Sequence, residues 1–126
     1  MKGVKKKILI VDDDRNLAKL NESFLKLLGY DTRVIHDGAT ALRVLLEYRP
    51  DLIIFDVMMP IMDGYTACRT IVEDPQYHPV PKIIIMTTRD SERDEQVSRL
   101  LGAEAFLNKP VEPGELVSKV KELIGM

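Results

Sequence analysis

The sequence predicts an α/β domain with a doubly wound, five-stranded parallel sheet and helices on both faces. The first observation is that short apolar runs alternate five times with helix-like segments. The second is that these runs are apolar on consecutive residues, as in strands that are buried on both faces. The chain of 126 residues suits one domain and leaves no room for another, so residues 1–126 are expected to form a single domain.

Three strands and one helix are predicted in the first part of the chain. The strands are Ile8 to Val11, a segment around Asp31 to Ile35, and Leu52 to Phe55. Gly29 ends a helix that follows the first strand, as a C-cap glycine does. This helix is indicated by apolar residues at helical spacing, namely Leu17, Leu20, Phe24, Leu27 and Leu28.

Turn residues bound the next two helices. Asp37–Gly38 leads into a helix that Pro50 stops, because the residue before a proline disfavours helical backbone. The third helix is expected to begin at Asp63–Gly64, and the segment Asp74 to Pro81, with its prolines, is predicted to be a loop. The buried side of the second helix is expected to be Leu42, Leu45 and Leu46.

The remaining strands are predicted at Ile83 to Met86 and Ala105 to Leu107. Between them, Gly102 ends a fourth helix that is marked by Val97, Leu100 and Leu101. The last helix has Pro113 in its first turn and the clearest pattern of a helix docked on a sheet. Its apolar stripe is Leu116, Val117, Val120, Leu123 and Ile124.

The composition limits the partners and the compartment. The net charge is −2 and the basic residues are scattered, so neither nucleic acid nor a membrane surface is an expected partner. The first seven residues are too polar for a signal peptide, and the single cysteine, Cys68, permits no internal disulfide. We therefore expect a cytoplasmic protein. The histidines, His36 and His78, lie in or near turns and are expected at the surface.

Polar residues lie at the carboxyl ends of four of the predicted strands. These residues are Asp12 and Asp13, Asp56, Thr87, and Lys109. Because the carboxyl ends of parallel strands meet at one edge of a sheet, these side chains are expected to converge there. Clustered carboxylates repel one another and favour a cation, and an oxygen-rich site of this kind suits Mg²⁺. Asp14, in contrast, is expected to cap the following helix.

This combination of groups suits phosphoryl chemistry. A carboxylate beside Mg²⁺, a hydroxyl and a lysine can act as a nucleophile toward phosphorus and form an acyl phosphate. Asp56 is the better candidate for the nucleophile, since the adjacent Asp12 and Asp13 look like a pair that holds the metal.

The motifs at these positions resemble those of the receiver domain of two-component response regulators. They are ILIVDDD at 8–14, IIFDVMMPIMDG at 53–64, IIIMTT at 83–88 and GAEAFLNKP at 102–110. The resemblance covers the chain nearly end to end and implies the flavodoxin-like (βα)5 receiver fold. It also implies a phosphoacceptor switch rather than an enzyme with its own substrate, although such a domain assists its own phosphorylation and dephosphorylation.

By this resemblance, Asp56 is the phosphoacceptor that takes a phosphoryl group from the phosphohistidine of a sensor kinase. Asp13, Asp56 and the backbone carbonyl of Met58 would coordinate Mg²⁺, and Asp12 would hold a metal-bound water. The family further implies a cis peptide bond at Lys109–Pro110.

The resemblance also assigns roles in phosphoryl binding and switching. Thr87 and Lys109 would bind the phosphoryl oxygens, and Phe106 would turn inward when Thr87 moves toward the phosphate. Met58 and Arg89 lie where the family tunes the lifetime of the phosphorylated state. Methionine cannot orient a water molecule by hydrogen bonding, which favours slow self-dephosphorylation.

The implied partners are a sensor histidine kinase or phosphotransfer protein, and an output protein or domain. The latter would bind the face formed by the fourth helix, the fifth strand and the fifth helix. The domain would be a monomer or a weak, phosphorylation-dependent dimer.

Three other functions are consistent with parts of the pattern. A phosphohydrolase with an aspartate nucleophile would need a second carboxylate as acid and base, whereas Val57 and Met58 follow Asp56. A flavin binder of the same fold would need a phosphate loop where the acidic residues 12–14 stand. A scaffold that docks partners without phosphorylation remains open, although the complete set of site residues argues against it.

Overall fold

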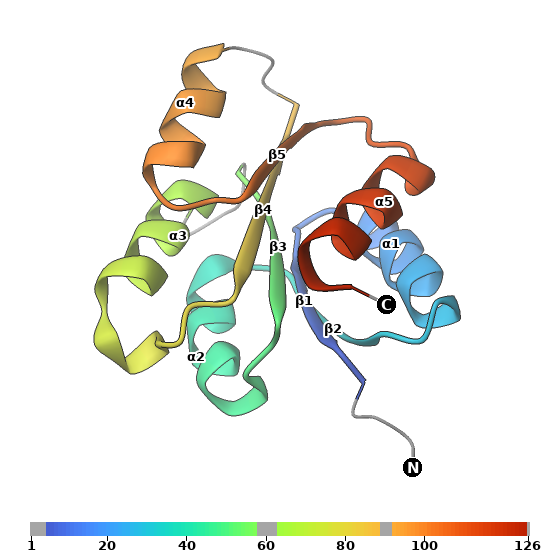
Figure 1. The fold of residues 1–126 in the computed structure, drawn as a ribbon, viewed down its shortest axis with the longest axis horizontal. Helices are drawn as coiled ribbons and strands as arrows, with labels where there is room; N and C mark the ends of the chain where they lie inside the picture. Colours follow the sequence, from blue (N-terminus) through green and yellow to red (C-terminus); the bar gives the residue numbers. More distant parts are fainter. Residues whose placement is uncertain (1–4, 58–62, 89–91, 126) are drawn as a thin grey trace.

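The computed structural model describes residues 5–57, 63–88 and 92–125, of which residues 92–94 are described by their backbone only. Five parallel strands form one sheet in the order β2-β1-β3-β4-β5, the order of flavodoxin-like folds (Figure 1). The strands are β1 (Lys7–Val11), β2 (Asp31–Ile35), β3 (Leu52–Asp56), β4 (Lys82–Thr87) and β5 (Ala105–Asn108). The predicted fold class and all five predicted strands are thereby confirmed.

Five α-helices connect and follow these strands. They are α1 (Arg15–Leu27), α2 (Gly38–Tyr48), α3 (Gly64–Glu73), α4 (Glu92–Leu100) and α5 (Pro113–Ile124). α1 and α5 lie on one side of the sheet, and α2 and α3 lie on the other (Figure 1). The predicted loop between α3 and β4 contains a short 3-10 helix, Pro75–Tyr77. Within the described residues, no helix is long and apolar enough to span a membrane.

The sheet divides the apolar interior into two cores. One core, hereafter the α2–α3 core, is covered by α2 and α3. Ile83 and Ile85 of β4 belong to it together with Leu45 and Ile71. Ile84 and Met86 of the same strand belong to the α1–α5 core, which α1 and α5 cover. This alternation follows from the two-residue period of a strand and explains why the strand sequences are apolar without interruption.

The helix α1 is confirmed, but the apolar stripe that predicted it is not its buried side. Its buried residues are Ala18, Asn21 and Leu25. Leu20 is 49% exposed and Leu27 is 83% exposed. A small residue such as Ala18 lets the helix backbone approach the sheet closely, so packing rather than residue hydrophobicity decides which side faces inward.

The other helices follow the sequence pattern more closely. The apolar stripe of α5 packs in the α1–α5 core, and the predicted face of α2 packs in the α2–α3 core. In α4, however, Ser98 is buried whereas Leu100 is 86% exposed. The turn from α4 into β5 brings Leu101 against the α2–α3 core. This leaves Leu100, on another side of the helix, in solvent.

Asp37 caps α2 and provides a test of local stability. Its carboxylate accepts hydrogen bonds from Thr40 N at 2.7 Å and Thr40 Oγ1 at 2.8 Å. The backbone N–H and then the hydroxyl of Thr40 stabilise the charged carboxylate, which lowers the pKa of Asp37 below its ordinary value of 3.8. We expect Asp37→Ala to lower the free energy of unfolding by about 1 kcal/mol at pH 7.

The pH dependence of this loss has a defined sign. Because the pKa of Asp37 is lower in the folded state, its contribution is present above about pH 4 and is lost as the pH falls through the folded pKa. Urea unfolding of both proteins at pH 7 and at low pH measures this difference. Asp37→Asn, which keeps an N-cap without a titrating group, should stay close to the original protein at pH 7. A constant difference at all pH values would contradict the expectation.

Candidate functional site

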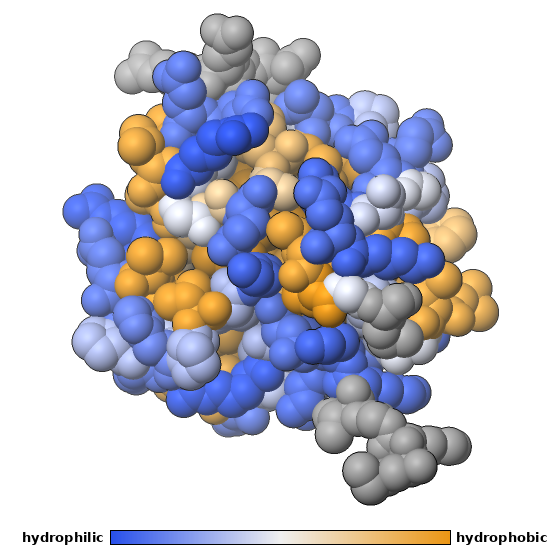
Figure 2. Space-filling view, viewed as in Figure 1, coloured by the Kyte–Doolittle hydropathy of each residue, from blue (hydrophilic) through white to orange (hydrophobic). Residues whose placement is uncertain are grey.

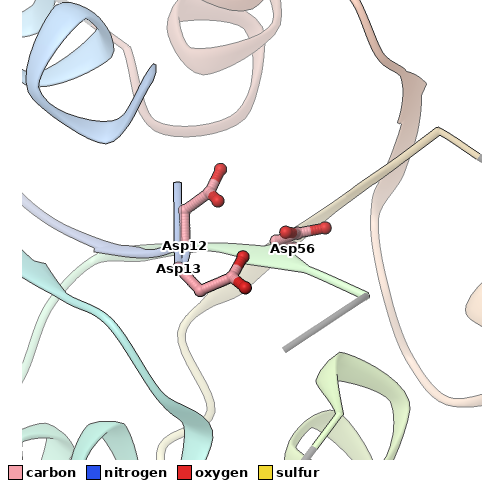
Figure 3. A group of neighbouring side chains, drawn as sticks. All are labelled: Asp12, Asp13 and Asp56. Atoms are coloured by element: carbon pink, nitrogen blue, oxygen red, sulfur yellow. The ribbon is translucent and has the colours of Figure 1, made fainter. Parts of the chain in front are cut away.

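Three carboxylates meet at the carboxyl edge of the sheet. Asp12 and Asp13 directly follow β1, and Asp56 is the last residue of β3, which pairs with β1. One oxygen from each of the three carboxylates lies within 4.8 Å of the other two (Figure 3). Asp12 and Asp56 are buried whereas Asp13 is exposed. The convergence predicted from the strand ends is thus confirmed.

Lys109 neutralises two of these carboxylates. Its Nζ lies 3.0 Å from Asp12 Oδ2 and 3.3 Å from Asp56 Oδ2. Burial by itself would lower the pKa of this ammonium group, but the hydrogen bonds and the negative charges of Asp12 and Asp56 outweigh burial and raise the pKa. Lys109 therefore remains charged at neutral pH and occupies a position from which it can contact anionic oxygens beside Asp56.

Thr87 lies at the same edge, as predicted. It is the last residue of β4, it is fully buried, and it pairs with Asn108 of β5. Its backbone carbonyl accepts a hydrogen bond from Lys109 N at 2.7 Å. The cis peptide bond that the family resemblance implied at Lys109–Pro110 is also present.

Asp12 also has a structural role. Its Oδ1 accepts a hydrogen bond from Asp14 N at 2.9 Å, while Oδ2 contacts Lys109. Asp14 caps α1 as expected, since its Oδ1 accepts a hydrogen bond from Leu17 N at 3.0 Å. Both oxygens of Asp12 therefore have protein partners, whereas the exposed carboxylate of Asp13 faces solvent.

The backbone next to Asp56 is closely packed against the start of α3. Gly64 N donates a hydrogen bond to Val57 O at 3.1 Å. A Cβ atom at Gly64 would lie only 2.7 Å from Asp56 O and 3.1 Å from Val57 Cα. Only glycine fits at this position without displacing the backbone that carries Asp56.

The predicted switch and lifetime residues are described only in part. Phe106 lies in β5 opposite Ile85, is partly buried and packs against the α2–α3 core. Met58, with its backbone carbonyl as a predicted metal ligand, and Arg89 lie outside the described residues.

His36 contacts the site, although the sequence analysis placed it at the surface. Its Nδ1 lies 3.0 Å from the backbone carbonyl oxygen of Asp12, and the residue is only partly exposed. A signal for this contact was present in the sequence, because His36 directly follows β2, the neighbour of β1. His78, in contrast, is exposed as expected.

The donor set fits a hard divalent cation. Carboxylate oxygens are the ligands that Mg²⁺ prefers, and Mg²⁺ keeps several waters when only one or two carboxylates bind it directly. Asp12, Asp13 and Asp56 together provide carboxylate oxygens that lie close enough to one another to hold such an ion.

Comparisons with known proteins agree with this geometry. The family model described as the response regulator receiver domain matches residues 8–121. The DNA-binding response regulator MtrA of Mycobacterium tuberculosis is 38% identical over 121 residues, which are 96% of this chain and 51% of MtrA. The chain thus spans about half the length of the curated relatives it matches.

Two solved structures show the same likeness. The chemotaxis response regulator CheY4 of Vibrio cholerae has a TM-score of 0.88 at 30% identity, with 96% of this chain and 100% of CheY4 covered. The signal receiver domain of a signal transduction histidine kinase from Syntrophus aciditrophicus has a TM-score of 0.84 at 39% identity, with 94% and 89% covered. The chain therefore belongs to the family of response regulator receiver domains of two-component systems.

Proposed function

We propose that residues 1–126 form a single receiver domain that accepts a phosphoryl group on Asp56 from the phosphohistidine of a sensor kinase or phosphotransfer protein. The observation that carries this proposal is the position of Asp56. Asp56 is the last residue of the central strand β3, and its Oδ2 lies 3.3 Å from Lys109 Nζ. It also lies beside two further carboxylates that can hold a cation. This arrangement supplies a nucleophile and positive charge at one place.

The transfer follows from the chemistry of these groups. An Asp56 carboxylate oxygen forms a bond to phosphorus as the bond between phosphorus and the histidine nitrogen breaks, and that electron pair stays on the imidazole. Lys109 already lies between Asp12 and Asp56, so only a short movement of its Nζ is needed to contact a phosphoryl oxygen. The buried hydroxyl of Thr87 would donate a hydrogen bond to another oxygen.

Asp13, Asp56 and the Met58 carbonyl would hold Mg²⁺, with Asp12 on a metal-bound water. When bound, the ion would supply positive charge that offsets the charge of the phosphoryl oxygens. The domain would then act as a switch that assists its own phosphorylation and dephosphorylation. Met58 and Arg89 would set the lifetime of the phosphorylated state.

The output of the switch would be a change of the face formed by α4, β5 and α5. A phosphoryl group on Asp56 would attract Thr87, and Phe106, which packs partly buried against the α2–α3 core, would turn inward. The changed face would bind an output protein or domain. We place this activity in the cytoplasm, where sensor kinases present their phosphohistidine.

Intact mass spectrometry after incubation with acetyl phosphate and Mg²⁺ tests the proposal. We expect a gain of one phosphoryl group that hydroxylamine removes, as it does an acyl phosphate. The gain should be absent in Asp56→Asn and in metal-free buffer. Asp14→Asn is the matched control, because asparagine also caps a helix and Asp14 is not proposed to react.

Either result separates the candidate functions. If Asp56→Asn gains no phosphoryl group while Asp14→Asn still gains one, the result supports Asp56 as the phosphoacceptor. No gain in the folded protein that binds Mg²⁺ would overturn the proposal and favour a scaffold that acts without phosphorylation.

A further inference from the structure

His36 lies against the backbone of the two adjacent carboxylates of the site. Its Nδ1 lies 3.0 Å from the backbone carbonyl oxygen of Asp12. A carbonyl oxygen only accepts hydrogen bonds, so Nδ1 carries the hydrogen and donates it. The preceding residue, Ile35, accepts a hydrogen bond from Asp12 N, also at 3.0 Å. The end of β2 therefore holds the backbone of Asp12 at both its N–H and its carbonyl group.

The bonded carbonyl belongs to the peptide group that joins Asp12 to Asp13. A peptide group is planar, so a hydrogen bond to its oxygen also orients the backbone nitrogen of Asp13. The Asp12 carboxylate has further contacts, with Asp14 N and Lys109 Nζ. The Asp13 carboxylate is exposed, and among the residues that the structure describes no hydrogen bond or ion pair holds it. The direction of the Asp13 side chain thus depends on this peptide group.

This direction matters for a metal ion. One oxygen of Asp13 lies within 4.8 Å of an oxygen of Asp12 and of Asp56, and Figure 3 shows the Asp13 carboxylate on the side of Asp56. Mg²⁺ requires a near-ideal octahedral arrangement of its ligands, so a rotated Asp13 would no longer serve the same ion as Asp56. A hydrogen bond that prevents this rotation lets the ion bind without first ordering the segment.

The surroundings of the imidazole are polar. The ring lines a groove of about 280 Å³, and the other lining residues are Arg15, Lys19 and Glu22 of α1 and Val34 of β2. The apolar side chains of α1 gather instead toward its far end, where they appear in orange at the right-hand edge of Figure 2. The ring is only partly exposed, and the hydrogen bond to Asp12, rather than apolar packing, orients it.

We propose that His36 is a positioning residue of the Mg²⁺ site, which holds the Asp12–Asp13 peptide so that the Asp13 carboxylate is directed toward Asp56. This role rests on the Mg²⁺ site of the proposed function, but not on transfer of a phosphoryl group. It belongs to the Nδ1–H donor and not to the bulk of the ring. Asparagine at this position would place its amide nitrogen where Nδ1 lies and would donate a similar bond, whereas leucine has a similar size and no donor.

Titration of the metal-free protein with Mg²⁺ at one fixed pH, followed by the backbone amide signals in NMR spectra, tests this role. We expect His36→Leu to weaken the Mg²⁺ affinity about tenfold, as the loss of groups that support metal ligands does. His36→Asn should recover most of the affinity. The same spectra show whether each variant is folded.

His78→Leu is the matched control. His78 Nε2 lies 2.9 Å from the backbone carbonyl oxygen of Val72, so this variant also removes a contact between an imidazole and a carbonyl group. His78 lies in the segment before β4, which enters the sheet at the edge opposite the carboxylates. Its replacement should leave the Mg²⁺ affinity unchanged.

Phosphoryl uptake from acetyl phosphate provides a second readout. In His36→Leu the rate should reach the maximum of the original protein, but at an Mg²⁺ concentration about tenfold higher, because the reacting groups are intact. A general loss of structure would lower the maximum as well and would overturn the role.

The outcomes separate this role from the proposed function. Equal Mg²⁺ affinities of His36→Leu and the original protein would overturn the role of His36 alone. A loss that His36→Asn does not recover would overturn it in favour of packing by the ring. An original protein that binds no Mg²⁺ would overturn the metal site and this role together. A protein that binds Mg²⁺ in the expected order of variants, but takes up no phosphoryl group, would support the role and contradict the proposed function.

Discussion

Replacing Lys109 by methionine is expected to lower the free energy of unfolding of the metal-free protein by about 3 kcal/mol at pH 7. The substitution keeps most of the side-chain volume but removes the ammonium group that lies 3.0 Å from Asp12 and 3.3 Å from Asp56. Two carboxylates at most 7% exposed would then lie side by side without a compensating charge. Urea unfolding monitored by circular dichroism measures the difference.

The pH dependence and the response to Mg²⁺ identify the cause of this loss. Because the pKa of Lys109 is raised above 10.5 in the folded state, its contribution is complete below that pH and is lost as the pH rises through the folded pKa. The difference between the two proteins should thus be the same at pH 7 and pH 9. Mg²⁺ should raise the Tm of the variant more than that of the original protein, because it replaces the missing positive charge.

Lys119→Met is the control for the loss of a lysine. Lys119 Nζ lies 3.0 Å from Glu122 Oε2, a similar distance, but this pair is exposed to solvent. Its removal should change the free energy of unfolding by less than about 1 kcal/mol, as exposed ion pairs do. Equal losses in the two variants would contradict a special role of the buried charges. An equal effect of Mg²⁺ on Lys109→Met and on the original protein would contradict the metal site.

A second large effect is expected for Gly64→Ala, which should lower the free energy of unfolding by about 2 kcal/mol. The new methyl group would lie 2.7 Å from Asp56 O, and the neighbouring atoms belong to the backbone, which cannot rotate away as a side chain could. The displacement would move Asp56 itself. We therefore expect a loss of Mg²⁺ affinity and of phosphoryl uptake along with the loss of stability.

Gly114→Ala is the matched control for this substitution. Gly114 lies in the first turn of α5, and a Cβ atom there would meet nothing within 4 Å. Alanine also favours the helical backbone, so this variant should be as stable as the original protein or up to about 1 kcal/mol more stable. If Gly64→Ala behaved in the same way, the close contact with Asp56 would have no energetic importance.

The strands and most of the site could be predicted because one rule applied to each of them. Strands buried on both faces are apolar without interruption, and parallel strands end at the same edge, so Asp56, Thr87 and Lys109 had to converge. The same rule places His36 at that edge, since it follows β2. A position in a turn, taken alone, predicts a surface histidine, whereas the bond to the Asp12 carbonyl depends on the strand that precedes His36.

The orientation of α1 could not be predicted in the same way. Apolar residues at helical spacing show that a helix has an apolar side, but not which side packs against the sheet. In α1 the buried side carries Ala18 and Asn21, while Leu20 and Leu27 face outward. In α1, therefore, the more hydrophobic residues are the more exposed ones, and only the position of the helix on the sheet reveals this. Leu100 of α4 is a second case of the same kind.

The separation of the two cores by the sheet has a consequence for how the molecule can transmit a signal. Phe106 packs against the α2–α3 core, whereas its neighbours in β5, Ala105 and Leu107, pack in the α1–α5 core. A rotation of Phe106 would rearrange the first core directly and would reach the second only through the backbone of β5. If Asp56 accepts a phosphoryl group as proposed, the two sides of the sheet would respond in sequence. The α2–α3 core would change through Phe106 itself, and α5 on the opposite side would change only as far as the backbone of β5 moves.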